Sequence, residues 1–168
     1  QAILPRKLKT GKSAAETSVV GFSLTATHSY MEFCTATSIA TGFSQNGINT
    51  TMFGCFADTC TTGFTCAATA GPSKVIACVA KACVTVGFTA VDYSTIFAFC
   101  IAYGGTGSSD GFVTTANGVV FFNCTSWGNA GDGWQLGGGF ITHTLINCVS
   151  VGNAAFQYHA VTSGEVSA

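Results

Sequence analysis

The stretch 123–130, NCTSWGNA, returns 24 residues later at 147–154 as NCVSVGNA. A glycine-led triplet from this stretch recurs in looser form and defines seven registers between residue 17 and about residue 160. The seven glycines are Gly21, Gly42, Gly63, Gly87, Gly104, Gly128 and Gly152, at spacings of 21, 21, 24, 17, 24 and 24 residues. A period of this length is typical of stacked units that contact only their neighbours.

Few repeat architectures have this period. The chain holds too few leucines for leucine-rich repeats, and paired-helix repeats have longer units. Three short strands per coil, joined by turns and stacked at about 4.8 Å, do fit it. We therefore predict an all-β parallel solenoid of about seven coils, with 17–24 residues per coil, over residues 17–160.

In a solenoid, equivalent residues of successive coils lie above one another. We expect a core stack of aromatic rings and, near the C-terminus, a ladder of hydrogen-bonded amides. The predicted ring stack consists of Phe22, Phe43, Phe64 and Phe88, and the predicted ladder of Asn129 and Asn153. The repeated glycine is expected to supply the backbone freedom of a tight corner.

The composition agrees with a β-structure. Only 8% of the 168 residues are charged, whereas 48% are hydrophobic. A helical bundle needs charged outer faces, and disordered chains have few aromatic residues, so both classes are disfavoured. The most apolar stretch, 75–103, is interrupted by polar residues, and we interpret it as buried strands rather than a membrane span.

The charge is unevenly distributed. Residues 1–16 form a predicted extended arm that carries four of the six basic residues, and residues 161–168 form a predicted C-terminal tail. The arm's basic residues are Arg6, Lys7, Lys9 and Lys12. The arm is either a solvated terminus or a segment that docks on an acidic neighbour. Nucleic acid is not an expected partner, because the rest of the chain has almost no basic surface.

Nine cysteines leave at least one without an intramolecular disulfide partner. We expect four of them to lie one coil apart as buried thiols of the core: Cys83, Cys100, Cys124 and Cys148. The alternative is a disulfide across coils, for which Cys78 and Cys83 are the candidates. No metal or cofactor is predicted, because the cysteines lack the paired spacing of zinc sites and the histidines are scattered.

The pattern Asn-Cys-x-Ser-x-Gly-Asn, combined with Asp-Gly-Phe at 110–112 and Asp-Gly-Trp at 132–134, resembles a known family. It is similar to the right-handed parallel β-helix repeats of pectate-lyase-like proteins, which bacteriophage tailspikes and other virion proteins share. The resemblance covers about residues 98–160. It implies a right-handed coil and leaves the activity open.

Enzymes that resemble this coil pattern need catalytic groups that are hard to find here. The lyases use a basic residue and the hydrolases a tight group of carboxylates. Asp110 and Asp132 come closest, since both follow the corner in adjacent coils, and they define a candidate glycan or calcium region. The alternative is that each Asp-Gly pair closes a turn. Asp92 extends this row, and His28, His143 and His159 show no common register with an acid and a nucleophile.

The strand that precedes the repeated glycine is predicted to be apolar on both sides, so that something covers its outer side. The candidate interface residues are Val86, Ile101, Tyr103, Trp127 and Val151. A homo-oligomer around a shared axis, with a trimer as the first expectation, or a larger protein assembly would cover them. Loops of the same chain are the alternative cover.

These patterns predict a non-enzymatic structural protein. The leading hypothesis is a virion surface component, such as a capsid decoration protein or a fibre or spike segment, found on the virion or outside the cell. The alternative is an extracellular polysaccharide-binding or lyase-like module that uses Asp110 and Asp132, with a surface glycan as the partner. The third hypothesis is an adhesin or filament subunit.

Overall fold

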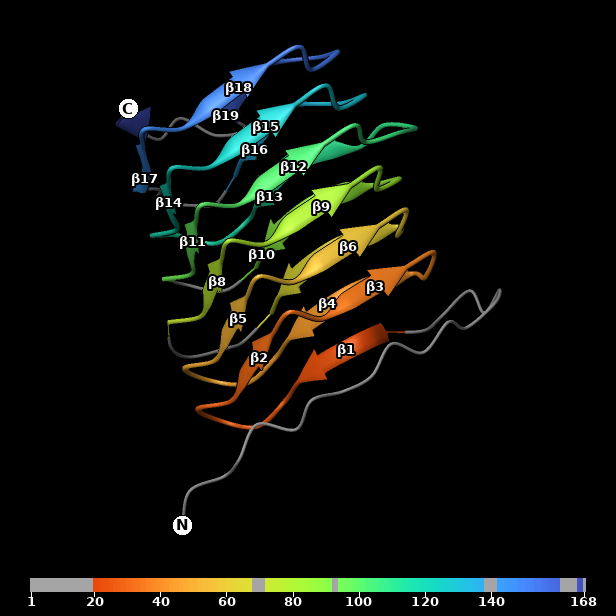
Figure 1. Ribbon diagram of the computed structural model, residues 1–168. Coiled ribbons are helices and arrows are strands. Elements are labelled where there is room, and N and C mark those ends of the chain that lie inside the picture. Colours follow the sequence, from red (N-terminus) through yellow and green to blue (C-terminus); the bar gives the residue numbers. More distant parts are fainter. Residues whose placement is uncertain (1–19, 68–71, 92–93, 138–141, 161–165, 168) are drawn as a thin grey trace.

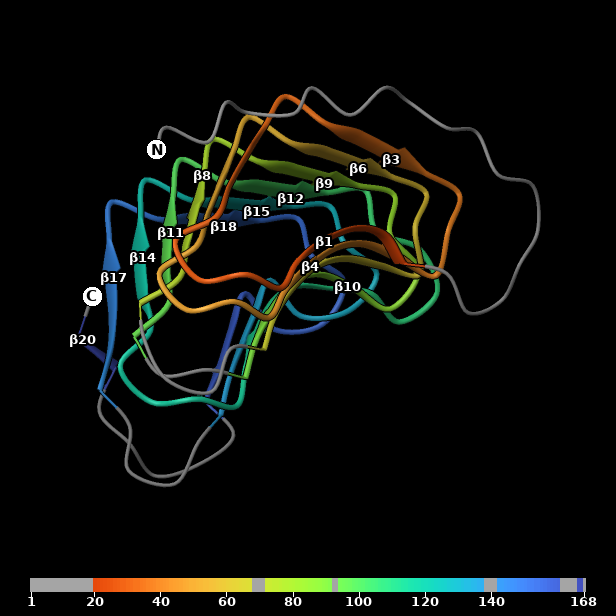
Figure 2. The same ribbon diagram turned by 90° about the horizontal axis from the view of Figure 1, so that it is seen from below.

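The computed structural model describes residues 20–67, 72–91, 94–137, 142–160 and 166–167. In these residues each strand pairs in parallel with the equivalent strands of neighbouring coils, which stack along one axis (Figure 1). Seen from the N-terminal end, the chain turns clockwise as it recedes, so the solenoid is right-handed (Figure 2). The predicted all-β, right-handed parallel β-helix is confirmed.

The described strands form three parallel sheets, one for each side of the coil. Sheet A comprises β1 (Val20–Leu24), β4 (Thr41–Gln45), β7 (Thr62–Cys66), β10 (Val86–Ala90), β13 (Asp110–Thr114), β16 (Trp134–Leu136) and β19 (Tyr158–Ala160). Sheet B comprises β2 (Tyr30–Glu32), β5 (Thr51–Phe53), β8 (Lys74–Ile76), β11 (Ile96–Ala98), β14 (Val120–Phe122), β17 (His143–Ile146) and β20 (Val166–Ser167). Sheet C comprises β3 (Thr35–Thr37), β6 (Phe56–Asp58), β9 (Val79–Lys81), β12 (Ile101–Tyr103), β15 (Thr125–Trp127) and β18 (Val149–Val151).

The core of sheet A is one continuous stack of aromatic rings. The four predicted phenylalanines lie parallel at centroid distances of 4.7–5.2 Å. The stack continues beyond them through Phe112, Trp134 and Tyr158. The predicted stack is therefore confirmed and extends to the last strand of the sheet.

This stack gives the true repeat length. Its seven rings, Phe22, Phe43, Phe64, Phe88, Phe112, Trp134 and Tyr158, are 21, 21, 24, 24, 22 and 24 residues apart. The described part of the chain thus makes about six turns rather than seven. The predicted 17-residue coil was wrong, because Gly87 aligns with Gly111 and not with Gly104.

A glycine precedes every stacked ring except Tyr158, and this glycine is required by space. A Cβ on Gly42 would lie 2.7 Å from the carbonyl oxygen of Gly63 and 3.1 Å from the Cβ of Ala57 on sheet C. The equivalent Gly87 faces Ala102 in the same way. The expectation that this glycine supplies left-handed backbone freedom was wrong, because its φ is not positive.

Left-handed residues instead form columns at the corners of the coil. At the corner between sheets B and C, φ lies between 49° and 62° in Phe33, Gly54, Ala77, Phe99, Asn123 and Asn147. At the end of sheet C a second column contains Ser38, Thr59, Ala82, Gly104, Gly128 and Gly152. Three of the glycines in the predicted triplet thus belong to this corner, where positive φ is needed.

Of the two predicted terminal segments, the structure describes part of the C-terminal one. The arm, with Arg6, Lys7, Lys9 and Lys12, lies outside the described residues. In the segment 161–168, β20 pairs with β17 and so adds a strand to sheet B. Val166 lies opposite His143 in this pairing.

Candidate functional site

The two predicted carboxylates lie in adjacent coils, at the ends where strands β13 and β16 of sheet A begin. Asp110 begins β13, and its Oδ1 accepts a hydrogen bond from the backbone N–H of Asp132 at 2.6 Å. Burial raises the pKa of Asp110, and the charge of Asp132 adds to the rise, whereas the Asp132 N–H and His159 oppose it. Asp92, which was expected to extend the row, lies outside the described residues.

Asp132 is buried and tied to the following coil. Its Oδ1 accepts a hydrogen bond from Phe156 N–H at 2.9 Å, and its Oδ2 lies 2.7 Å from Nδ1 of His159. The His159 ring packs on the exposed ring of Phe156, with centroids 4.9 Å apart. The sequence predicts no register that His159 shares with both an acid and a nucleophile, and the structure brings it to an acid, Asp132. The pairing of Gln135 with His159 brings this histidine over β16, and the 24-residue period would have indicated it.

The other two histidines lie elsewhere. His28 occupies an exposed corner, 3.5 Å from the side-chain nitrogen of Asn49, and His143 is buried at the start of β17. In the described residues no three His, Cys, Asp or Glu side chains come together as a metal site. The same residues contain no helix of the length and hydropathy that a membrane crossing needs.

Eight of the nine cysteines form two columns instead of the one predicted, and Cys66 lies apart in β7. Cys83 stacks on Cys60, at the corner that follows sheet C. The other column precedes the strands of sheet C and consists of Cys34, Cys55, Cys78, Cys100, Cys124 and Cys148. Cys34 and Cys148 are half-buried, and the thiols between them are buried. The candidate pair Cys78 and Cys83 was wrong, because β9 separates the two by about 10 Å, too far for a disulfide.

The column of Cys60 and Cys83 continues as the predicted amide ladder. Asn129 Nδ2 donates to Asn153 Oδ1 at 2.9 Å, and the backbone N–H of Gly105 donates to Asn129 Oδ1 at 3.0 Å. Both asparagines are buried. One interior column thus changes from thiols to amides along the solenoid, and the ladder is confirmed.

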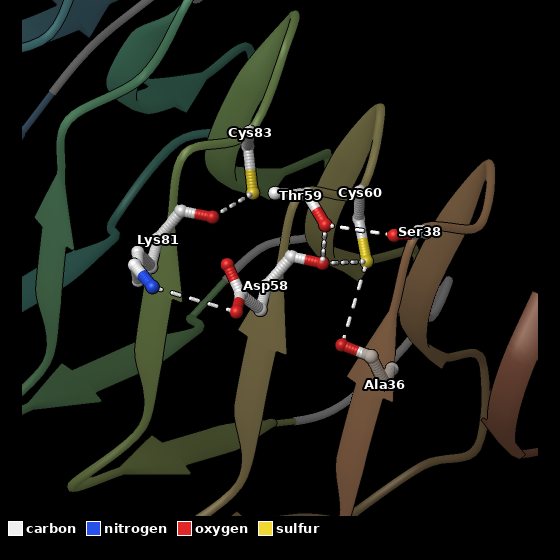
Figure 3. A network of polar contacts seen from close by, with 7 residues as sticks. All are labelled: Ala36, Ser38, Asp58, Thr59, Cys60, Lys81 and Cys83. Carbon is white, nitrogen blue, oxygen red and sulfur yellow. Dashed lines mark hydrogen bonds and ion pairs between the residues drawn. The ribbon is translucent and has the colours of Figure 1, made fainter. Parts of the chain in front are cut away.

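The outer face of sheet C is polar near the N-terminus. Lys81 Nζ lies 3.5 Å from Asp58 Oδ2, and the hydroxyl groups of Ser38 and Thr59 lie 2.9 Å apart (Figure 3). Asp58 and Lys81 occupy one outward row with Thr37. This half of the face offers charged and hydroxyl groups to solvent.

The same row becomes apolar in the later coils. Lys81 is followed by Tyr103, Trp127 and Val151, and Trp127 and Val151 are 55% and 50% exposed. The rings of Tyr103 and Trp127 stack at 6.1 Å. Ile101 lies in the neighbouring outward row and is exposed. Four of the five candidate interface residues therefore share one outer face.

Val86, the fifth, does not belong to this face. It is buried at the start of β10, in sheet A, and pairs with Thr62 and Asp110. The error has the same cause as the 17-residue coil. Aligning Gly104 with Gly87 placed the residue before each glycine in one row, although these residues belong to different sheets.

Sequence reasoning missed that the apolar surface continues around the corner onto sheet B. Phe99 at the corner is 53% exposed and packs edge-on against Phe122, with ring centroids 5.6 Å apart. The outward row of β5, β8, β14 and β17 contributes Phe53, Ile76, Phe122 and Ile146. The row of sheet C next to the corner contributes Phe56, Val79, Ile101 and Val149.

We call this surface the apolar flank. It comprises these two rows, the corner residues Phe33 and Phe99, and Tyr103, Trp127 and Val151. The sequence signal was present, because an apolar residue recurs just before every described corner except the first, where Glu32 stands. The flank runs along the corner between sheets B and C, which forms a ridge in the end-on view (Figure 2).

No family model, curated protein or solved structure matches the chain.

Proposed function

We propose that the protein is a structural component that assembles with copies of itself through the apolar flank. The observation that carries the proposal is Trp127, which is 55% exposed in a row with Tyr103 and Val151. Large apolar side chains that gather on one side of a folded chain mark a surface that another protein covers.

The shape of the flank supports a cyclic assembly. The flank is convex, since sheets B and C meet along its middle. A ridge of this kind is buried on both sides when sheet B of one copy faces sheet C of the next. Such a contact repeats around an axis and closes into a ring. We therefore propose a trimer with the corner between sheets B and C toward the axis.

The flank gives each copy a limited contact area. About six coils at a spacing of about 4.8 Å give a strip about 30 Å long. Two three-residue strands and the corner make it about 25 Å wide. A trimer divides this area between two neighbours, so the ring has to close before each copy buries the roughly 800 Å² that a stable interface takes from each partner.

The setting we propose is a virion surface or the cell exterior, as a decoration protein or a fibre or spike segment. Support comes from the repeats at 123–130 and 147–154, which resemble those of bacteriophage β-helical proteins. An adhesin or filament subunit would use the same flank, and the assembly test below applies to it equally.

The test is sedimentation velocity of the protein and of two variants that change opposite sides of the ridge. Trp127→Lys places a charge in the row of sheet C that already holds Lys81. Phe122→Glu places a charge in the row of sheet B that already holds Glu32. The fold accepts these charges in other coils, so the variants should fold. We expect the parent chain to sediment as a trimer of 17.1 kDa subunits, and each variant as a monomer.

Thr89→Lys is the matched control, because Thr89 faces outward on sheet A, away from the flank. This variant should remain a trimer. A parent chain that sediments as a monomer at every concentration would contradict the proposal, and so would a trimer that both flank variants leave intact.

A polysaccharide-binding module is the second candidate, and the Asp132–His159 pair favours it. An oriented imidazole, the carboxyl of Asp110 and the exposed Phe156 ring together offer polar and stacking contacts to a sugar. A glycan array with the parent chain and with Asp110→Asn tests this candidate. A glycan that the parent chain binds and the variant does not would support a polysaccharide-binding module. An array on which the parent chain binds no glycan would exclude it.

A further inference from the structure

His143 occupies an unusual place in the last coil. It is the first residue of β17, lies between Val119 of the coil before and Val166 of β20, and is 2% exposed. Among the described residues, neither of its ring nitrogens has a hydrogen-bond partner. The equivalent positions of earlier coils hold Thr50, Ser73, Thr95 and Val119, none of which carries charge.

The carbonyl groups of Gly137 and Val119 lie near the His143 ring but outside hydrogen-bond geometry, so burial disfavours the protonated form of the imidazole. Burial lowers the pKa of His143, and the carbonyl groups of Gly137 and Val119 oppose this only in part. Acidification through the ordinary histidine pKa of about 6.5 therefore leaves the unfolded segment binding more protons than the folded one. The fold of this coil therefore keeps its full stability above that pKa, where His143 is neutral in both states, and loses stability as the pH falls below it.

Other titratable groups of this coil act elsewhere. The carboxylates of Asp110 and Asp132 precede β16, whereas Gly137, which faces His143, follows β16. Asp132 holds His159 and Phe156 and so secures the far end of the coil. The raised pKa of Asp110 acts in the opposite sense, because a protonated Asp110 is better tolerated in the fold than in the unfolded chain.

We propose that His143 makes the last coil, which contains β17 and β18, a pH-sensitive element that opens on mild acidification while the earlier coils stay folded. The open state brings the charged imidazole to water, and β17 then separates from β14. Because Ile146, Val149 and Val151 of the apolar flank lie in this coil, opening would also weaken the assembly. That last consequence rests on the proposed function, and the opening itself does not.

Hydrogen exchange on the full chain, followed by mass spectrometry, tests the opening. Protection factors for β17 and β18 would be compared with those for β5 and β6 at about pH 7.5 and about pH 5.5, on either side of the ordinary histidine pKa. We expect protection of β17 and β18 to fall at the lower pH by up to about tenfold, because about nine tenths of free imidazoles with a pKa of about 6.5 are protonated at about pH 5.5. Protection of β5 and β6 should not change.

Two variants assign the effect to His143. His143→Leu places an apolar residue where the coil before has Val119, and His143→Gln keeps a polar group that does not titrate. Either should abolish the difference between the two pH values, whereas His159→Gln should retain it. The proposal is overturned if a folded His143 variant keeps the acid-induced loss, or if protection in the parent chain falls equally in all coils. A monomeric parent chain would refute the proposed function, and the exchange measurement would still test the opening of the last coil.

Discussion

At the scale of single residues, the glycines of this chain meet two unrelated requirements. Gly87 and its equivalents let sheet A approach the small residues of sheet C, whereas Gly104 and its equivalents adopt positive φ at a corner. A repeat search based on glycine alone merges the two sets. This merging produced both the 17-residue coil and the misplacement of Val86.

We predict that Gly87→Ala lowers the free energy of unfolding by about 1–3 kcal/mol, the usual cost of overpacking. The new Cβ would lie 2.7 Å from the carbonyl oxygen of Gly111 and 2.9 Å from the Cβ of Ala102, neither of which can move freely. Urea unfolding measures the change. Thr89→Ala on the outer side of the same strand is the control and should change stability by less than about 0.5 kcal/mol. An equal effect of both variants would contradict the spatial role of Gly87.

The amide ladder leads to a second prediction at this scale. Asn129→Ala should lower the free energy of unfolding by about 1–3 kcal/mol, because the buried N–H of Gly105 loses its acceptor. Asn147→Gly is the matched control. Asn147 also bonds an asparagine one coil away, Asn123, but it is exposed, and its positive φ suits glycine. Its loss should cost less than about 0.5 kcal/mol, and a larger cost than that of Asn129→Ala would be evidence against the ladder's importance.

At the scale of the element, the sequence predicts which residue types stack in a column better than it predicts which residues pair between coils. The Gly-Phe pair predicts the ring stack, and it continues visibly as Gly111-Phe112 and Gly133-Trp134. The six cysteines before sheet C are also evenly spaced in the sequence. The contact between Asp132 and His159 was missed although it follows a 24-residue coil, because Gln157 stands where the earlier coils have the glycine that marks the repeat.

The cysteine columns predict an ordered pattern of alkylation. Only a thiolate reacts readily, and burial together with neighbouring thiols raises the pKa of Cys83 and of Cys124 to about 12. The pKa values of Cys34 and Cys148 are raised as well, and the hydrogen bond with Cys78 lowers that of the buried Cys55, so the order of reaction is set by access. Iodoacetamide on the native protein should modify at most Cys34 and Cys148, the half-buried ends of their column. Intact mass and peptide mapping measure this, and all nine should react after unfolding. Modification of Cys78 as fast as Cys148 would contradict the buried column.

At the scale of the whole molecule, the polar and the large apolar side chains lie on different parts of the surface. Sheet A presents the hydroxyl side chains of Thr62, Thr65 and Thr89 outward, and the early part of sheet C carries the Asp58–Lys81 pair. The apolar flank is confined to the ridge between sheets B and C. The sequence predicts its centre, Tyr103, Trp127 and Val151, but not its continuation onto sheet B, which requires the corner geometry.

The central claim is that the apolar flank lies between copies of the chain, and crosslinking from position 127 tests it most directly. A photoreactive phenylalanine analogue is suited to this position, since the row already holds Tyr103 and Trp127. We predict crosslinks between chains that map to β14 or β17 on sheet B of a second copy, and none between chains from the same group at position 89. Products confined to a single chain, or crosslinks between chains from position 89 as abundant as those from position 127, would contradict the claim.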